Sequence, residues 1–353
     1  MTALVLLIII LACVAYQHLK GSLLGAAASV VITICSCIAA FAYFELLANL
    51  FITHAGSRFP ALLPWVQSLC FILLFVIALA ILQTIASKLI RKSVEFDDLP
   101  EKIGRCLCGA ILGFILTGLL LTTVAMAPLP EKFPYRRFEP IANPQKPNKA
   151  MLNPDGFLCG LFGLVSRGSM SSKTSFAVIH PSLIDELFLN RHITGKSTPL
   201  LTEKNAISLP PKAAAWLAPD TLKNKDGTNI TPKTGHTLTI VRVGIKPNGQ
   251  YFTTAQLRLI CKEKISSDDL LKGKAVNIYP VGYLSAKDRL ETKQLNELIS
   301  LNFSASTGPG KLVDFVFEVP DNYSPALVAF KQNSIAQVPK LINPDDAPDY
   351  VPF

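Results

Sequence analysis

Four long stretches of almost unbroken apolar residues fill the first 130 positions of the chain. A helix needs about 20 apolar residues to cross the hydrocarbon core of a bilayer. We therefore expect a bundle of four transmembrane helices over residues 1–128. The predicted spans are Thr2–Tyr16, completed by Gln17 and His18, then Leu23–Tyr43, Leu62–Ile85 and Cys106–Met126.

The first stretch has a second interpretation, a cleaved secretory signal peptide. Such a peptide begins with a positively charged segment ahead of its apolar region. The first cation of this chain is Lys20, which follows the apolar run. We therefore expect the first stretch to be retained as a span.

Proline and charge replace the apolar pattern after residue 128. Residues 129–155 hold six prolines, which predicts a stiff, extended linker. Residues 156–234 follow as a helical and loop segment. Its first helix starts near Asp155 and is expected either to lie on the bilayer surface or, as we favour, to pack under the next domain. A second helix starts near Pro181.

A period of two marks residues 235–342. Val313, Phe315 and Phe317 alternate with Asp314, and Arg258 lies opposite its apolar neighbours, so we expect an antiparallel sheet with one solvated face. The expected fold class is therefore a four-helix membrane bundle followed by an α+β extracytoplasmic region. That region ends in a small antiparallel β-sandwich and a tail, 343–353. The expected strands are "HTLTIVRVGI", "YFTTAQLRLIC", "AVNIYPVGY", "LVDFVFEV" and "PALVAF".

Charge separates the two halves and suggests an orientation. From residue 130 onward there are 27 Lys and Arg against 20 Asp and Glu, which accounts for most of the net charge of +9. The densest cations of the membrane half lie between the third and fourth spans, and loops rich in cations stay in the cytoplasm. The C-terminal region is then extracytoplasmic, although Lys132, Arg136 and Arg137 oppose this orientation. The orienting residues are Lys88, Arg91, Lys92, Lys102 and Arg105.

Small residues interrupt the second and fourth spans. Glycine lets helix backbones approach closely in lipid, where little hydrophobic force brings helices together. We expect tight crossings inside one bundle, with a homo-oligomer interface as the alternative. The candidate packing glycines are Gly21, Gly25, Gly104, Gly109, Gly113 and Gly118.

Few residues of the chain are candidates for a chemical role. Glu45 and Asn49 are the polar residues nearest the interior of a span. Cys159 and Cys261 stand apart from the cysteines of the spans and are a candidate disulfide. Neither a metal site nor a cofactor is expected, because the C-x-x-C spacing of zinc sites is missing. Widely spaced histidines (His180, His192 and His236) and a serine-rich turn (Ser166, Ser169 and Ser171) match no catalytic motif.

The stretches "HLKGSLLG" and "RCLCGAILG" resemble the starts of the second and fourth spans of the CvpA, or colicin V production, family. The resemblance covers about residues 1–130 and implies a bacterial inner-membrane protein linked to colicin V production or export. The chain departs from the family in lacking an Asp in its first span. Gly104, in place of Asp, precedes Arg105, and Gln17 stands where the family has its first Gly.

We therefore expect a non-enzymatic accessory protein of the inner membrane. Its extracytoplasmic domain would bind an envelope or secretion protein or an anionic wall polymer, and its spans the lipid bilayer. The scattered lysines carry no nucleic-acid motif, and a solvated basic surface without a specific partner is also consistent with them. The alternative is a small transporter or channel component.

Overall fold

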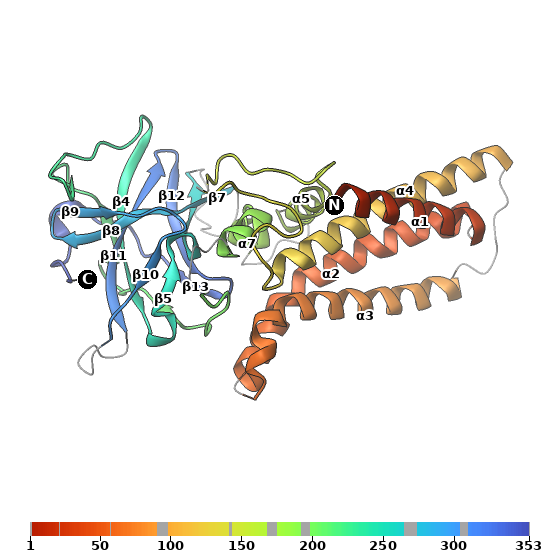
Figure 1. Ribbon diagram of the computed structural model, residues 1–353, viewed down its shortest axis with the longest axis horizontal. Coiled ribbons are helices and arrows are strands. Elements are labelled where there is room, and N and C mark those ends of the chain that lie inside the picture. Colours follow the sequence, from red (N-terminus) through yellow and green to blue (C-terminus); the bar gives the residue numbers. More distant parts are fainter. Residues whose placement is uncertain are drawn as a thin grey trace. The chain divides into compact units, whose positions relative to one another are not determined.

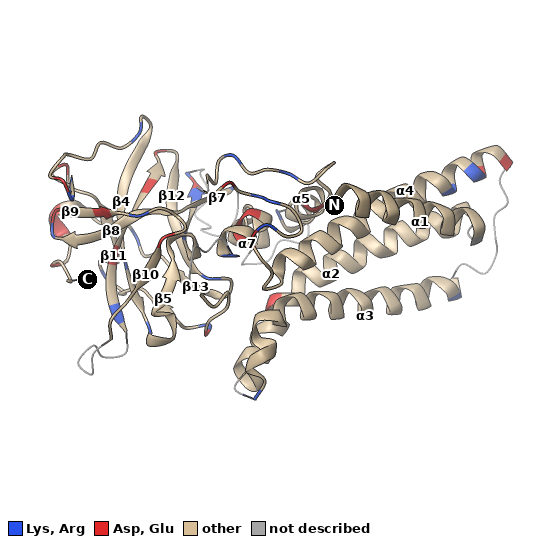
Figure 2. Cartoon of the chain, viewed as in Figure 1, with Lys and Arg blue, Asp and Glu red and all other residues tan. Residues whose placement is uncertain are grey.

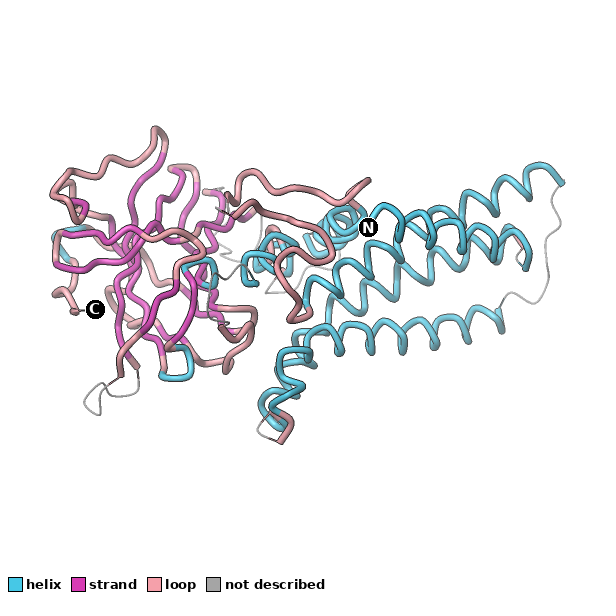
Figure 3. The backbone as a smooth tube through the Cα atoms, in the orientation of Figure 1, coloured by secondary structure: helices cyan, strands magenta, loops and turns pink. Residues whose placement is uncertain are grey.

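The computed structural model divides the chain into two compact units. Unit 1 comprises residues 1–137 and 147–162, and unit 2 comprises residues 138–146 and 163–353. Helices dominate unit 1 and strands dominate unit 2 (Figure 3). The structure describes residues 2–20, 22–56, 58–89, 98–140, 143–167, 175–191, 198–264, 274–303 and 310–352.

Four long helices build unit 1 (Figure 1). The helix α4 is central, because it contacts each of the other three, and α2 also packs along α3. A short 3-10 helix, η1 (Pro60–Trp65), leads into α3. The bounds are α1 (Thr2–Lys20), α2 (Leu23–Ala55), α3 (Val66–Leu89) and α4 (Asp98–Met126).

All four helices are long and apolar enough to cross a membrane. Their outward faces carry large apolar side chains, such as Leu7, Ile77 and Leu107, each about half exposed or more. Such faces are favourable in lipid and unfavourable in water. These features indicate a membrane protein.

The helices α2 and α4 are longer than the predicted spans. The prediction ended the second span at Tyr43, but α2 continues to Ala55 and so measures about 50 Å. The helix α4 begins at Asp98, eight residues before the predicted span. Polar residues ended the predicted spans without ending the helices.

The proline-rich linker is partly folded onto unit 1. The backbone N–H of Asn148 donates to the Arg137 carbonyl across 2.8 Å, which closes a loop. Arg137 and Ala150 are both buried. The segment is therefore more compact than the extended connector that its prolines predict.

Unit 2 begins with short helices and continues as strands. The helices are α5 (Pro154–Arg167), which starts in unit 1, α6 (Phe176–Ile179) and α7 (Leu183–Arg191). The larger sheet has the order β1-β4-β11-β8-β9-β3, with β2 also on β4. Its strands are β1 (Ile207–Ser208), β2 (Ala215–Leu217), β3 (Lys223–Asn224), β4 (His236–Ile245), β8 (Pro280–Ala286), β9 (Arg289–Thr292) and β11 (Lys311–Pro320).

A second sheet of four strands has the order β13-β12-β6-β7, and β5 pairs with β10 separately. Among the strands that the structure describes, the pairs are antiparallel except β3 with β9. The strand-rich region therefore consists of largely antiparallel sheets, as the alternating pattern predicts. These strands are β5 (Tyr251–Thr253), β6 (Leu257–Glu263), β7 (Ala275–Ile278), β10 (Leu298–Ser300), β12 (Tyr323–Phe330) and β13 (Ser334–Gln337).

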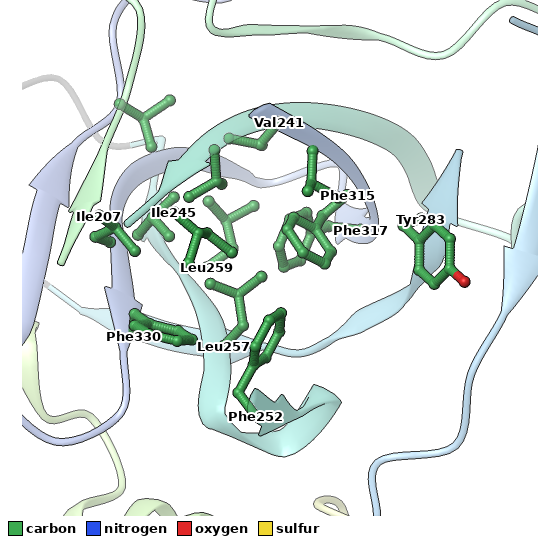
Figure 4. Packing of buried hydrophobic residues seen from close by; sticks show 14 of the residues in the cluster. Ile207, Val241, Ile245, Phe252, Leu257, Leu259, Tyr283, Phe315, Phe317 and Phe330 are labelled. Carbon is green, nitrogen blue, oxygen red and sulfur yellow. The ribbon is translucent and has the colours of Figure 1, made fainter. Parts of the chain in front are cut away.

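Side chains from both sheets meet in one apolar core (Figure 4). Phe315 of β11 lies near Phe252, with ring centroids 6.2 Å apart, and Phe252 in turn meets Phe330 of β12 at 5.1 Å. The inward positions Leu257 and Leu259 of β6 are fully buried in this core. The period of two identified these inward residues correctly.

The opposite face of the larger sheet is buried as well, which corrects the expectation of a solvated face. Trp216 and Leu222, from the segment expected to be a loop, cover Ile240 and Val316. Ile342, at the end of the expected β domain, and Tyr350 of the expected tail join the same cluster. Irregular segments that precede and follow the long strands in sequence therefore form a second layer on this face of the sheet.

Two predicted strands are each divided in the structure. A 3-10 turn, η3 (Thr254–Gln256), separates β5 from β6, and a capping box between Thr253 and Gln256 holds it. The run "AVNIYPVGY" divides at Tyr279 into β7 and β8, which belong to different sheets. Each division moves the chain from one sheet to another.

Candidate functional site

The helices α1 and α4 of unit 1 cross with their backbones in close contact. A β-carbon at Gly109 would stand 2.7 Å from the Cα of Val14, and one at Gly113 would stand 2.6 Å from the Cα of Ile10. Contacts this short leave no room for any side chain at either position. The G-x-x-x-G pair thus brings two backbones together within one chain.

The other candidate glycines differ in what they face. A β-carbon at Gly104 would meet the side chain of Leu23, and one at Gly118 would stand 2.4 Å from the carbonyl oxygen of Pro154. Gly25 approaches only its own cap residue, Ser22, so it makes no close helix crossing. Gly21 lies outside the described residues.

Gly118 of α4 packs directly against the start of α5. The ring of Phe157 meets Phe114 of α4 at 5.3 Å, and Phe162 stacks on Phe41 of α2 at 4.9 Å. Residues 154–162 therefore pack on the helix bundle itself. Residues 163–167 of the same helix belong to unit 2, so a position on the bilayer and a position under the next domain both stay predictions.

A buried polar cluster lies beside this contact between α4 and α5. Tyr135 donates a short hydrogen bond to Asp155, and Arg137 donates to the Tyr135 oxygen across 3.1 Å. Asp155 is only 1% exposed. Burial, followed by the Asp155 charge, raises the pKa of the Tyr135 hydroxyl, which stays a neutral donor. The cluster fixes the linker to the first turn of α5.

The described orienting cations lie near helix ends. Lys88 is exposed in the last turn of α3, and Lys102 is exposed in the second turn of α4 (Figure 2). Arg105 pairs with Glu101 and also donates to the carbonyl of His18 across 3.3 Å, so it holds α1 to α4. Arg91 and Lys92 lie outside the described residues.

Glu45 and Asn49 are both half-buried on α2, one turn apart. The helix continues ten residues beyond Glu45. Glu45 is therefore an internal helix residue, where the prediction placed it just past the end of the span.

The structure does not form the candidate disulfide between Cys159 and Cys261. The Cys159 sulfur lies 4.0 Å from the Thr122 hydroxyl oxygen in unit 1. Cys261 is fully buried in the core of unit 2, and burial raises the pKa of its thiol. Both residues keep their thiols, and Cys261 acts as an apolar core residue.

A buried ionic cluster joins α7 to the smaller sheet of unit 2. Glu186 accepts from Arg258 across 3.1 Å and from Asn277 across 2.7 Å, and its carboxylate also lies 2.6 Å from the His180 ring. Arg258 also donates to the carbonyl of Ile179 across 2.9 Å. Burial raises the pKa of the Glu186 carboxyl, but Arg258 and then His180 outweigh it, so the pKa lies below its usual value.

Arg242 and Asp314 form a second buried pair, between β4 and β11. The guanidinium makes two bonds to the carboxylate, of 2.7 and 2.8 Å, and lies 5.3 Å from the Trp216 ring. It also donates to the Asp349 carbonyl across 2.7 Å. Neither cluster was predicted from the sequence, although each has a cation, Arg258 or Arg242, within an otherwise apolar strand.

These arrangements position segments of the fold. Among the described residues, no group of three His, Cys, Asp or Glu side chains could hold a metal ion. The Ser166 hydroxyl accepts from the Ala177 N–H across 3.3 Å and so caps α6. His236 is partly exposed at the start of β4, while Ser169, Ser171 and His192 lie outside the described residues.

Comparison of the chain with family models, curated proteins and solved structures finds no match.

Proposed function

We propose that the chain is a membrane-anchored accessory protein that displays a binding domain. The observation that carries the proposal is a contrast between the two units. The helices of unit 1 expose long apolar side chains, whereas the strands of unit 2 bury theirs around one core. One unit is thus suited to lipid, and the other to water.

In this proposal, unit 2 is a small β-sandwich on the extracytoplasmic side of a bacterial inner membrane. Its surplus of lysine favours an anionic envelope partner, such as an acidic protein or wall polymer. The buried pairs at Glu186 and Arg242 keep its strands rigid, so that a partner meets a fixed surface.

The link to colicin V production or export rests on the resemblance at "HLKGSLLG" and "RCLCGAILG". A deletion in the native cells, complemented by the intact chain, tests it through the amount of exported bacteriocin peptide. We expect export to fall on deletion and to return with the intact chain. Unchanged export would refute this link.

A transporter component is the second candidate, and Glu45 is the observation that favours it. An ionisable side chain within an apolar helix can serve a conduction path, and Glu45 is half-buried with Asn49 one turn away. The accessory proposal expects Glu45→Gln to retain full function. Loss of function in a folded, inserted Glu45→Gln protein would favour transport.

A further inference from the structure

A groove of about 410 Å³ lies between α2 and α3 in unit 1. Its lining is apolar except for one imidazole. Leu50 and Leu73 form its walls and are each about half exposed, so the groove is accessible from the medium around the helices. The lining residues are Leu47, Leu50, Phe51, His54, Ala55, Cys70 and Leu73.

The spacing of these residues explains the groove. On α2 they recur every three or four positions and so share one face, and Cys70 and Leu73 do the same on α3. Ala55 and Cys70 are small, which leaves space between larger neighbours. Ala48 and Val66 are buried against Cys70 beside the groove.

Arg58 lies three residues beyond Ala55, the last lining residue of α2. The backbone N–H of Arg58 donates to the carbonyl of Ala55 across 3.0 Å, and the Arg58 side chain is exposed. His54, in the last turn of α2, places its Nδ1 3.0 Å from the carbonyl of Leu50. Glu45 lies on the opposite side of α2 from the groove. It precedes the lining residue Leu47 by two positions, which correspond to a rotation of about 200° around the helix axis.

We propose that this groove binds an acyl chain of an anionic phospholipid, with Arg58 contacting the phosphate. The inference rests on the membrane insertion proposed above. In a bilayer, acyl chains surround the exposed walls of the groove. An apolar groove that is followed by one cation matches a lipid tail below an anionic headgroup.

Photolabelling of the full chain in lipid nanodiscs tests the proposal. The probe is phosphatidylglycerol with a diazirine on one acyl chain, and phosphatidylcholine with the same chain is the comparison. Ala55→Phe and Cys70→Leu fill the groove, and Ala80→Phe is the matched change at an exposed position of α3. Arg58→Gln removes the cation, and Lys88→Gln is its control.

We expect labels to concentrate on residues 47–55 and 70–73, to fall several-fold in both filling variants and to persist in Ala80→Phe. Arg58→Gln should abolish the preference for phosphatidylglycerol, whereas Lys88→Gln should keep it. Even labelling of all outward faces, unchanged by Ala55→Phe, would show surrounding lipid only and overturn the site. Equal labelling by both lipids would overturn the role of Arg58.

Alkaline carbonate extraction of the same membranes separates this result from the proposed function. Retention in the membrane with even labelling refutes the lipid site alone. Release of the chain by carbonate refutes insertion, and the lipid site with it.

Discussion

Gly109 of α4 lies directly against the backbone of Val14 in α1, where a β-carbon would approach the Val14 Cα to 2.7 Å. One turn further, Gly113 meets Ile10 in the same way. The hydroxyl of Thr117, which is buried, bonds back to the carbonyl of Gly113 across 2.8 Å. The crossing therefore buries polar backbone and a hydroxyl without leaving them unsatisfied.

Substitution of Gly113 by Ala should destabilise the bundle. The added methyl group must push α1 away, and overpacking of this kind costs about 1–3 kcal/mol. Unfolding of the full chain in mixed micelles with increasing SDS, followed by circular dichroism, measures the change. Gly160→Ala in α5 is the matched control, because its added β-carbon would meet no other part of the described chain within 4 Å. Equal stability of the two variants would contradict the crossing.

Substitution of Gly118 by Ala should loosen the start of α5. The new β-carbon would stand 2.4 Å from the Pro154 carbonyl oxygen, so residues 154–162 must shift. Cys159 then loses its place beside Thr122, and its reaction with a maleimide should become several-fold faster in a chain whose other cysteines are replaced. An unchanged rate would show that α5 does not depend on Gly118.

Removal of one member of the Glu186 cluster should destabilise unit 2. Glu186→Gln leaves the Arg258 charge buried, and breaking a buried pair costs about 3–5 kcal/mol. Fluorescence of Trp216 in the full chain, with Trp65 replaced by Phe, reports the unfolding. Because double replacement removes both charges, Glu186→Gln with Arg258→Met should cost less than the sum of the single changes. Additive losses would contradict direct pairing.

The same carboxyl predicts a pH dependence. The pKa of Glu186 is lower in the folded chain than its usual value of 4.5, so the unfolded chain binds the proton more readily. The stabilisation is complete above pH 4.5 and is lost as the pH falls through the lowered pKa. The free energy of unfolding should therefore fall more steeply in this acid range in the wild type than in Glu186→Gln.

Lys331 should act in the opposite sense. It is 4% exposed, its ammonium has no hydrogen-bond partner among the described residues, and burial lowers its pKa from 10.5 to about 8. The buried cation costs stability below pH 8, and this cost disappears as the pH rises towards 10.5. Lys331→Met should thus gain up to about 3 kcal/mol at pH 7 and lose the rise in stability above pH 8. The exposed Lys340→Met is the control.

The sequence predicted the helices and the inward strand faces because apolar periodicity records burial directly. Prediction from the sequence failed where side chains are buried by segments that are distant in the sequence. Arg242 and Asp314 sit on the predicted solvated face, but Trp216 and the C-terminal segment, far away in sequence, cover them. The contact between α5 and α4 was not predicted for the same reason, since only the fold brings Pro154 to Gly118.

The side of the membrane on which unit 2 lies can be measured by cysteine labelling. Two single cysteines are introduced into a cysteine-free chain in intact bacteria, Lys225→Cys in unit 2 and Lys88→Cys at the end of α3, both at exposed positions. A membrane-impermeant maleimide should label Lys225→Cys in intact cells and Lys88→Cys only in broken cells. Labelling of Lys88→Cys in intact cells, with Lys225→Cys protected, would place unit 2 in the cytoplasm and contradict the account.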